Sequence, residues 1–188
     1  MTTLEAIRDA LPEYARDLKL NLSSVLSAAG APGLSETQIW AIALASAAAS
    51  RNRRMLAAFD ALAAAHLDTV QRQAAHAAAA IMGMNNVYYR FVHLVGDADY
   101  AALPARLRMN VIGNPGIAKA DFELLSLAVS AINGCGACLA AHERQVRGQG
   151  MGREAVQSTV RIAATVHAVA RVLETAQFAN TEPAAEAA

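Results

Sequence analysis

Apolar residues recur at spacings of three and four along most of this 188-residue chain, which is the periodicity of an amphipathic α-helix. The first segment shows it at Leu4, Ile7, Leu11, Tyr14, Leu18, Leu22 and Val25. Pro12 stands where a helix can begin afresh, so we expect one kinked helix or two short ones. Alanine dominates the apolar residues, and only 5% of all residues are aromatic. This composition favours closely packed helices over a β-sandwich, and we predict an all-α helical bundle.

Two capping boxes, at residues 35–38 and 68–71, mark the starts of longer helices. The first predicts a helix that runs to about residue 50, and the second a long alanine-rich helix that ends near Gly96. Between them, the basic run 51–54 precedes another short helix, and we interpret this run as a solvated helix junction.

The last part of the chain predicts three further helices. Residues 97–116 are rich in turn-forming residues and precede a helix that carries Glu123. A helix that carries the cysteines follows, and the final helix is expected from Arg153 to about Phe178. Residues 180–188 are expected to form a disordered tail.

An internal repeat relates residues 32–59 to residues 115–142, with an offset of 83 positions from Pro32 to Pro115. A Pro-Gly pair and a Leu-Ala-Ala run recur in both parts. We therefore predict one domain, residues 1–179, built from a helical unit used twice. The reactive residues of the second copy have unreactive counterparts in the first: Trp40 for Glu123, Asn52 for Cys135, Met55 for Cys138 and Phe59 for His142.

The two cysteines of the chain, Cys135 and Cys138, are separated by two residues. Such a pair can cycle between dithiol and disulfide with little backbone movement. Asn133 and Gly134 can end one helix and let the next begin at the first cysteine, where the helix dipole favours a thiolate. Because His142 follows Cys138 by four residues, the two side chains share one face of a continuous helix.

Glu123, the Cys135-x-x-Cys138 pair and His142 resemble the active-site signature of the alkyl hydroperoxide reductase D family. The resemblance includes residues 11–14, 81–86, 109–110 and 114–116, and so covers nearly the whole chain. It implies an all-helical fold with an internal duplication, a homotrimer, and a dithiol that reduces organic hydroperoxides.

The resemblance also implies roles for the site residues. Cys138 would attack the peroxide, Cys135 would resolve the sulfenic acid as a disulfide, and Glu123 with His142 would relay the proton. Electrons would come through dihydrolipoamide on a lipoylated dihydrolipoamide acyltransferase, and would pass to the peroxiredoxin called alkyl hydroperoxide reductase C. No tightly bound cofactor is expected. Some relatives carry a histidine directly before the attacking cysteine, where this chain has Ala137, which predicts a leaner proton relay.

The chemistry of the residues agrees with these roles. Reduction of a peroxide by thiols needs an attacking thiolate, a proton for the leaving oxygen, and a second thiol that captures the sulfenic acid. The helix dipole alone favours Cys135 as the attacking thiolate, whereas His142 favours Cys138. A base beside the nucleophile outweighs a dipole contribution of about 0.3–1 kcal/mol, so we predict that Cys138 attacks.

Other functions remain open at this level. The same residues offer three zinc ligands, Cys135, Cys138 and His142, with Glu123 or water as a fourth, so a non-catalytic zinc- or thiol-based interaction module is the alternative. A carboxymuconolactone decarboxylase activity, on a related helical fold, is a further possibility. Haem attachment would require a histidine where Leu139 stands.

Charge and hydropathy exclude several partners. The chain has 16 basic and 16 acidic residues, which leaves no electrostatic signature of binding to nucleic acid or anionic membrane. No apolar run approaches the length of a membrane span. The charged N-terminal residues 1–9 lack the apolar core of a signal peptide, so we expect a cytoplasmic protein.

The remaining polar residues of interest receive no catalytic role. We interpret His66, His76, His93 and His167 as surface or core histidines. The Asn85–Asn86 pair and the aromatic cluster at residues 88–91 are interpreted as packing or subunit contacts. Because the predicted helix is otherwise apolar, the polar Asn85–Asn86 pair could also line a pocket.

Overall fold

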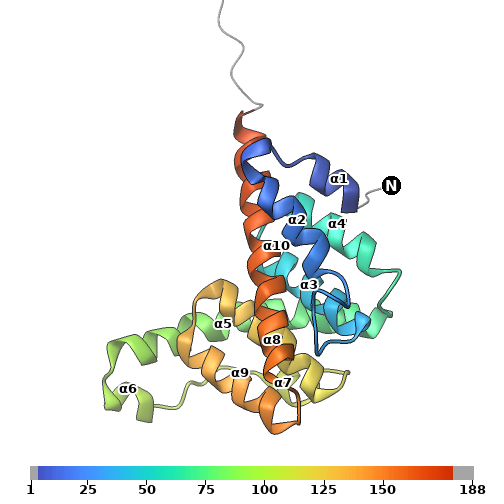
Figure 1. Cartoon of the computed structure of the whole chain (residues 1–188). Helices are drawn as coiled ribbons and strands as arrows, with labels where there is room; N and C mark the ends of the chain where they lie inside the picture. The colour runs from blue at the N-terminus through green and yellow to red at the C-terminus, as the bar shows by residue number, and fades with distance from the viewer. Residues whose placement is uncertain (1–3, 180–188) are drawn as a thin grey trace, which may run out of the picture.

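The computed structural model describes residues 4–179, and the tail expected at residues 180–188 lies outside them. The described residues form helices and no strand, as the composition predicts (Figure 1). The elements are α1 (Leu4–Asp9), η1 (Glu13–Ala15), α2 (Arg16–Val25), α3 (Glu36–Ala49), α4 (Arg53–Ala63), α5 (Thr69–Val95), α6 (Ala98–Ala102), α7 (Asn110–Gly113), α8 (Lys119–Asn133), α9 (Gly136–Gly148) and α10 (Arg153–Ala179).

Local sequence signals set most of the helix starts. The side chains of Ser35 and Asp68 each accept a hydrogen bond from the backbone three residues later, which completes the two predicted capping boxes at α3 and α5. Gly96, with a φ of 68°, ends α5 in the left-handed conformation. Pro12 precedes η1 and separates α1 from α2, so the N-terminal segment forms short helices instead of one kinked helix.

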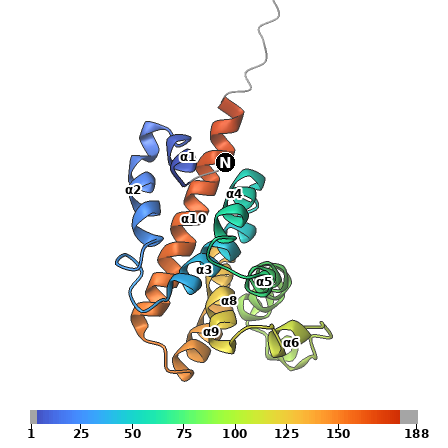
Figure 2. The same ribbon diagram turned by 90° about the vertical axis from the view of Figure 1, so that its right-hand side faces the viewer.

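The core is built around α3 and α8, which contact each other and are buried on nearly all sides. Residues 39–47 and 122–130 are buried without a break, as expected of helices that are apolar all round. Helices α5 and α10 each contact both members of this central pair. Figures 1 and 2 show the long α10 on one side of the pair and α5, seen end-on in Figure 2, on the other.

Shorter elements complete the bundle. Helix α2 packs on α10, α4 packs on α3, and α1 packs on α4. The loop before α3 approaches α10 closely at Gly33, where a Cβ atom would lie 2.8 Å from the backbone nitrogen of Ala155. Because Gly33 also has a φ of 81°, glycine is the residue that fits this approach.

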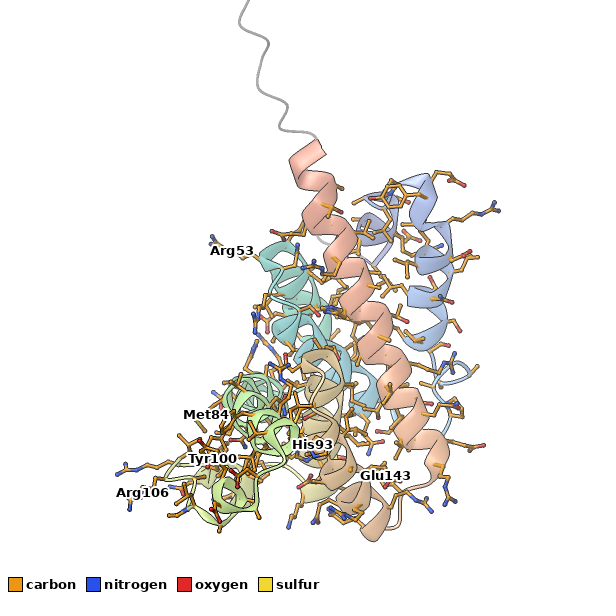
Figure 3. All side chains as sticks on the ribbon, turned by 90° about the vertical axis from the view of Figure 1, so that its left-hand side faces the viewer. Arg53, Met84, His93, Tyr100, Arg106 and Glu143 are labelled. Carbon is orange, nitrogen blue, oxygen red and sulfur yellow. A yellow bond between two sulfur atoms is a disulfide. The ribbon has the colours of Figure 1, made fainter. Side chains whose placement is uncertain are left out.

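The turn-rich segment at residues 97–116 contains two short helices, α6 and α7, that the sequence pattern does not predict. Helix α6 begins where Asp97 accepts a hydrogen bond from the backbone of Asp99. The C-terminal half of α5 and the segment after it project from the bundle, and Figure 3 places Met84, Tyr100 and Arg106 on this part. Among residues 4–179, no helix is both long and apolar enough to cross a membrane.

The helix bounds support the proposed duplication. Adding 83 to the bounds of α3, α4 and α5 gives 119–132, 136–146 and 152–178, close to those of α8, α9 and α10. The proposal therefore pairs each helix of the first unit with one of the second, in the same order.

Candidate active site

The junction between α8 and α9 carries both cysteines. Helix α8 ends at Gly134, whose φ of 68° is the left-handed cap expected of glycine, and α9 begins one residue later. Cys135 is the N-cap residue of α9, and its Sγ accepts a hydrogen bond of 3.3 Å from the backbone nitrogen of Cys138. The prediction that a new helix begins at the first cysteine is therefore confirmed.

Cys135 and Cys138 form a disulfide bond, as their spacing allows. Their surroundings differ. Cys135 is fully buried, whereas Cys138 is 7% exposed and contributes to the wall of a cavity. A small molecule that enters this cavity therefore meets Cys138 first.

Glu123 is the only charged residue in the buried stretch 122–130 of α8, and it is 4% exposed. A carboxylate buried to this extent needs a hydrogen-bonding partner. It has one in His142 of α9, whose Nδ1 lies 2.7 Å from Oε2 of Glu123. Because a carboxylate can only accept a hydrogen bond, the Nδ1–H group donates it and Nε2 is left to exchange a proton.

The cavity beside Cys138 has a volume of about 290 Å³. Its walls come from α5, from α9 and from the segment that includes α7: Met82, Asn85, Tyr89, Met109, Ile112, Ala137, Cys138, Ala141 and His142. Cys138 and His142 thus open onto the same space, with apolar and thioether side chains around them. A thiol, a proton-exchanging group and an apolar wall suit an uncharged organic substrate.

A buried chain of hydrogen bonds ties the end of α8 to α5. Asn86 donates to the hydroxyl of Ser130 over 2.9 Å and accepts from the side chain of Asn133 over 3.0 Å. Arg90 donates to the backbone oxygen of Asn133 over 2.7 Å. These contacts hold the turn that carries Cys135. In the sequence, their signal is the pair Asn86 and Arg90, two polar residues four positions apart on an otherwise apolar helix face.

The other histidines lie outside this cavity. His66 stacks on Trp40 with a ring-centre distance of 4.4 Å, and His76 pairs with Asp60. His167 lies 3.2 Å from the hydroxyl of Ser50, and burial together with the charge of Arg171 lowers its pKa. Neither these three nor His93 lines the wall around Cys138.

No three His, Cys, Asp or Glu side chains between residues 4 and 179 are grouped so as to hold a metal ion. In the disulfide form, both sulfur atoms are bonded to each other, so neither is a thiolate ligand. The zinc alternative therefore concerns the reduced protein.

Comparison with known proteins finds relatives that match nearly the whole chain. The chain is 58% identical over 172 residues to a protein of Rhodospirillum centenum named alkyl hydroperoxide reductase AhpD, across 92% of this chain and 91% of that protein. Proteins with the same name from Gluconacetobacter diazotrophicus and Frankia alni are 55% and 50% identical, over 97% and 98% of this chain and 99% and 100% of the respective proteins. Residues 98–181 also match the carboxymuconolactone decarboxylase family model.

Proposed function

Because this chain belongs to the family of alkyl hydroperoxide reductase AhpD, we propose that it reduces organic hydroperoxides through a dithiol–disulfide cycle of Cys135 and Cys138. One observation carries the proposal: Cys138 shares its cavity with His142, which is held by the buried carboxylate of Glu123. The arrangement supplies a nucleophile, a proton carrier and a second thiol within two helix turns.

The first step breaks the O–O bond. The Cys138 thiolate attacks the terminal oxygen of the hydroperoxide, an S–O bond forms, and the alkoxide leaves. The alkoxide takes a proton through His142 and becomes the alcohol, while Cys138 becomes a sulfenic acid. Glu123 holds the imidazole in place during this transfer.

The second step closes the disulfide. The Cys135 sulfur attacks the sulfur of the Cys138 sulfenic acid, the S–O bond breaks, and the oxygen leaves as water after it gains a proton. The disulfide then takes two electrons and two protons from an external dithiol. For each turnover, one hydroperoxide and one dithiol become one alcohol, one water and one disulfide.

The donor and partners of the cycle are the finer part of the proposal. Dihydrolipoamide on a lipoylated dihydrolipoamide acyltransferase supplies the electrons. In a given turnover, the reduced Cys135 and Cys138 pass them either to a hydroperoxide or to the peroxiredoxin alkyl hydroperoxide reductase C. The enzyme acts as a cytoplasmic, antioxidant homotrimer, and a reducing cytoplasm suits a cysteine pair that must be opened at each turnover.

The test is consumption of an alkyl hydroperoxide by the purified protein with dihydrolipoamide, compared with dithiothreitol and with NADH alone. We expect turnover with dihydrolipoamide and none with NADH alone. The variant His142→Asn should lose roughly 10²–10⁴-fold in kcat/KM because it removes the proton carrier. The control His76→Asn, at a histidine outside the cavity, should keep the original rate. Full turnover by Cys138→Ser would contradict the proposal.

Two other functions can be tested with the same purified protein. The match of residues 98–181 to the carboxymuconolactone decarboxylase model raises decarboxylation as a second candidate, in which the disulfide would have no part. Release of CO₂ from a carboxymuconolactone, without peroxidase turnover, would favour it. Stoichiometric zinc that blocks thiol titration of the reduced protein would favour an interaction module instead.

A further inference from the structure

Asn85 of α5 is a buried polar residue with an unused hydrogen-bonding atom. Its side chain lies in the wall of the cavity that contains Cys138 and His142, and the residue is 4% exposed. Within the described part of the chain, its Oδ1 is buried and has no hydrogen-bond partner. An unpaired buried polar atom destabilises the folded state, so its presence calls for a reason.

The neighbouring Asn86 shows what a structural asparagine looks like at this place. Its amide nitrogen donates to Ser130 and its oxygen accepts from Asn133, so both ends of the side chain are satisfied within the protein. Asn85 has no such role for its oxygen. Met82, Asn85 and Tyr89 recur at helical spacing along α5 and line the same cavity. Asn85 therefore belongs to the wall of the cavity that Cys138 also lines, and its unpaired oxygen is covered in this conformation.

We propose that the side-chain oxygen of Asn85 binds the hydroperoxide group of the substrate, an inference that rests on the function proposed above. A hydroperoxide carries one O–H donor, on the terminal oxygen that Cys138 attacks. Because Oδ1 of Asn85 has no partner to lose, the amide can turn toward the cavity, where Oδ1 accepts that hydrogen bond and orients the terminal oxygen. Met82, Met109 and Ile112 receive the alkyl group. The unpaired acceptor is thereby satisfied when the substrate is bound.

This contact predicts a defined substrate class. An alkyl hydroperoxide has both the O–H donor and the apolar group, whereas a dialkyl peroxide lacks the donor and hydrogen peroxide lacks the apolar group. An acceptor left unpaired in a closed site discriminates strongly against a ligand without the donor. The structure thus assigns preference for alkyl hydroperoxides to Asn85 and its apolar neighbours together.

The test compares the original protein with Asn85→Leu, which has a similar size and no polar atom. We expect kcat/KM for an alkyl hydroperoxide to fall about 2- to 13-fold, the ratio given by one hydrogen bond of ordinary net strength. The rate at which the reduced protein reacts with methyl methanethiosulfonate, a thiol reagent without a hydrogen-bond donor, should stay unchanged. Resistance to urea should be equal or higher, because an unpaired buried oxygen is removed.

The control is Ser126→Ala, which removes another buried, unpaired side-chain oxygen that does not line the cavity. It should leave the hydroperoxide kinetics unchanged. Unchanged kcat/KM in Asn85→Leu would overturn this inference and leave the proposed function standing. An equal loss in both the hydroperoxide and the thiosulfonate reactions would also overturn it, because Asn85 would then act on the thiolate. Absence of turnover in the original protein would overturn both proposals.

Discussion

Cys135 and Cys138 have opposite advantages as the attacking thiol. Cys135 caps α9 and its sulfur accepts a backbone hydrogen bond, which stabilises a thiolate. It is fully buried, whereas Cys138 faces the cavity that His142 also lines. A peroxide must reach the sulfur, and the leaving alkoxide must receive a proton there. Access and proton delivery therefore favour Cys138 as the attacking thiol. Together they outweigh the small stabilisation that the helix dipole gives to a Cys135 thiolate.

This difference predicts where the first oxidation product forms. After one equivalent of alkyl hydroperoxide, the Cys135→Ser variant should hold a sulfenic acid on Cys138, because serine cannot resolve it. Serine at position 135 can still cap α9, so the fold should be retained. Trapping with dimedone followed by peptide mass spectrometry identifies the modified residue. A dimedone adduct on Cys135 in the Cys138→Ser variant, with Cys135→Ser inert, would reverse the assignment.

The two halves of the chain carry different side-chain contacts on equivalent pairs of helices. In the second half, Glu123 of α8 meets His142 of α9 through a hydrogen bond. In the first half, the residues 83 positions earlier are Trp40 of α3 and Phe59 of α4, whose ring centres lie 6.4 Å apart. One helix pair thus holds a hydrogen bond between a carboxyl group and an imidazole, and the other holds a contact between two aromatic rings. The proposed duplication explains how a single packing geometry carries both.

A charge cluster outside the site links α4 to α5. Asp60 of α4 contacts Arg72 over 2.8 Å and His76 over 3.2 Å, both on α5. Burial raises the pKa of Asp60, but the hydrogen bonds and charges of His76 and Arg72 lower it by more. The pKa of Asp60 therefore lies below its ordinary value of 3.8. The folded chain therefore releases the Asp60 proton more readily than the unfolded chain.

The lowered pKa predicts an acid-dependent contribution to stability. It is fully present above the ordinary pKa of Asp60 and is lost as the pH falls through the lower pKa of the folded state. At pH 7, Asp60→Asn should lower the free energy of unfolding by roughly 0.2–1 kcal/mol, because the cluster is partly exposed. At a pH well below the ordinary pKa, the difference from the original protein should shrink. Urea unfolding at both pH values measures this.

Asp17→Asn is the matched control, since Asp17 lies exposed on α2 without an ion pair in the described structure. It should show no comparable pH-dependent difference. If Asp60→Asn were equally destabilised at both pH values, the loss would come from packing, and the charge explanation would be wrong.

The part of the molecule that projects from the bundle, the C-terminal half of α5 with the segment after it, has an apolar surface. The exposed side chains there are Val87, Phe91, Leu94, Val95, Tyr100 and Leu103, with Leu94 the most exposed at 73%. Phe91 of α5 and Tyr100 of α6 contact each other edge to face, with ring centres 5.3 Å apart. Apolar residues gathered in this way are typical of a protein–protein contact. We propose that this surface meets another copy of the chain in the proposed homotrimer.

Self-association predicts a change of mass in solution. Light scattering during size-exclusion chromatography should give three chains for the original protein and fewer for the double variant Phe91→Ser, Leu94→Ser, because the variant removes apolar area from the contact. The control Leu20→Ser changes a side chain that is 60% exposed on α2, and should remain trimeric. A double variant that keeps its helical circular dichroism and the trimer mass would place the contact elsewhere.

The sequence alone determined the features that depend on neighbours along the chain. Capping boxes predicted the starts of α3 and α5, and the Asn133–Gly134 pair predicted the break before α9, because these signals act within a few residues. The CxxC spacing likewise allowed the disulfide. The short helices α6 and α7 escaped prediction because too few residues carry a periodic pattern.

Only the tertiary structure decided which distant residues meet. Glu123 and His142 are 19 positions apart on different helices. The family resemblance predicted that they act together, whereas their spacing alone did not. The cavity lies between α5 and α9. Cys138 and Asn85 line it, whereas their neighbours Cys135 and Asn86 do not. These distinctions depend on how α5 crosses the α8–α9 pair, which many weak side-chain contacts set together, so no local sequence pattern encodes them.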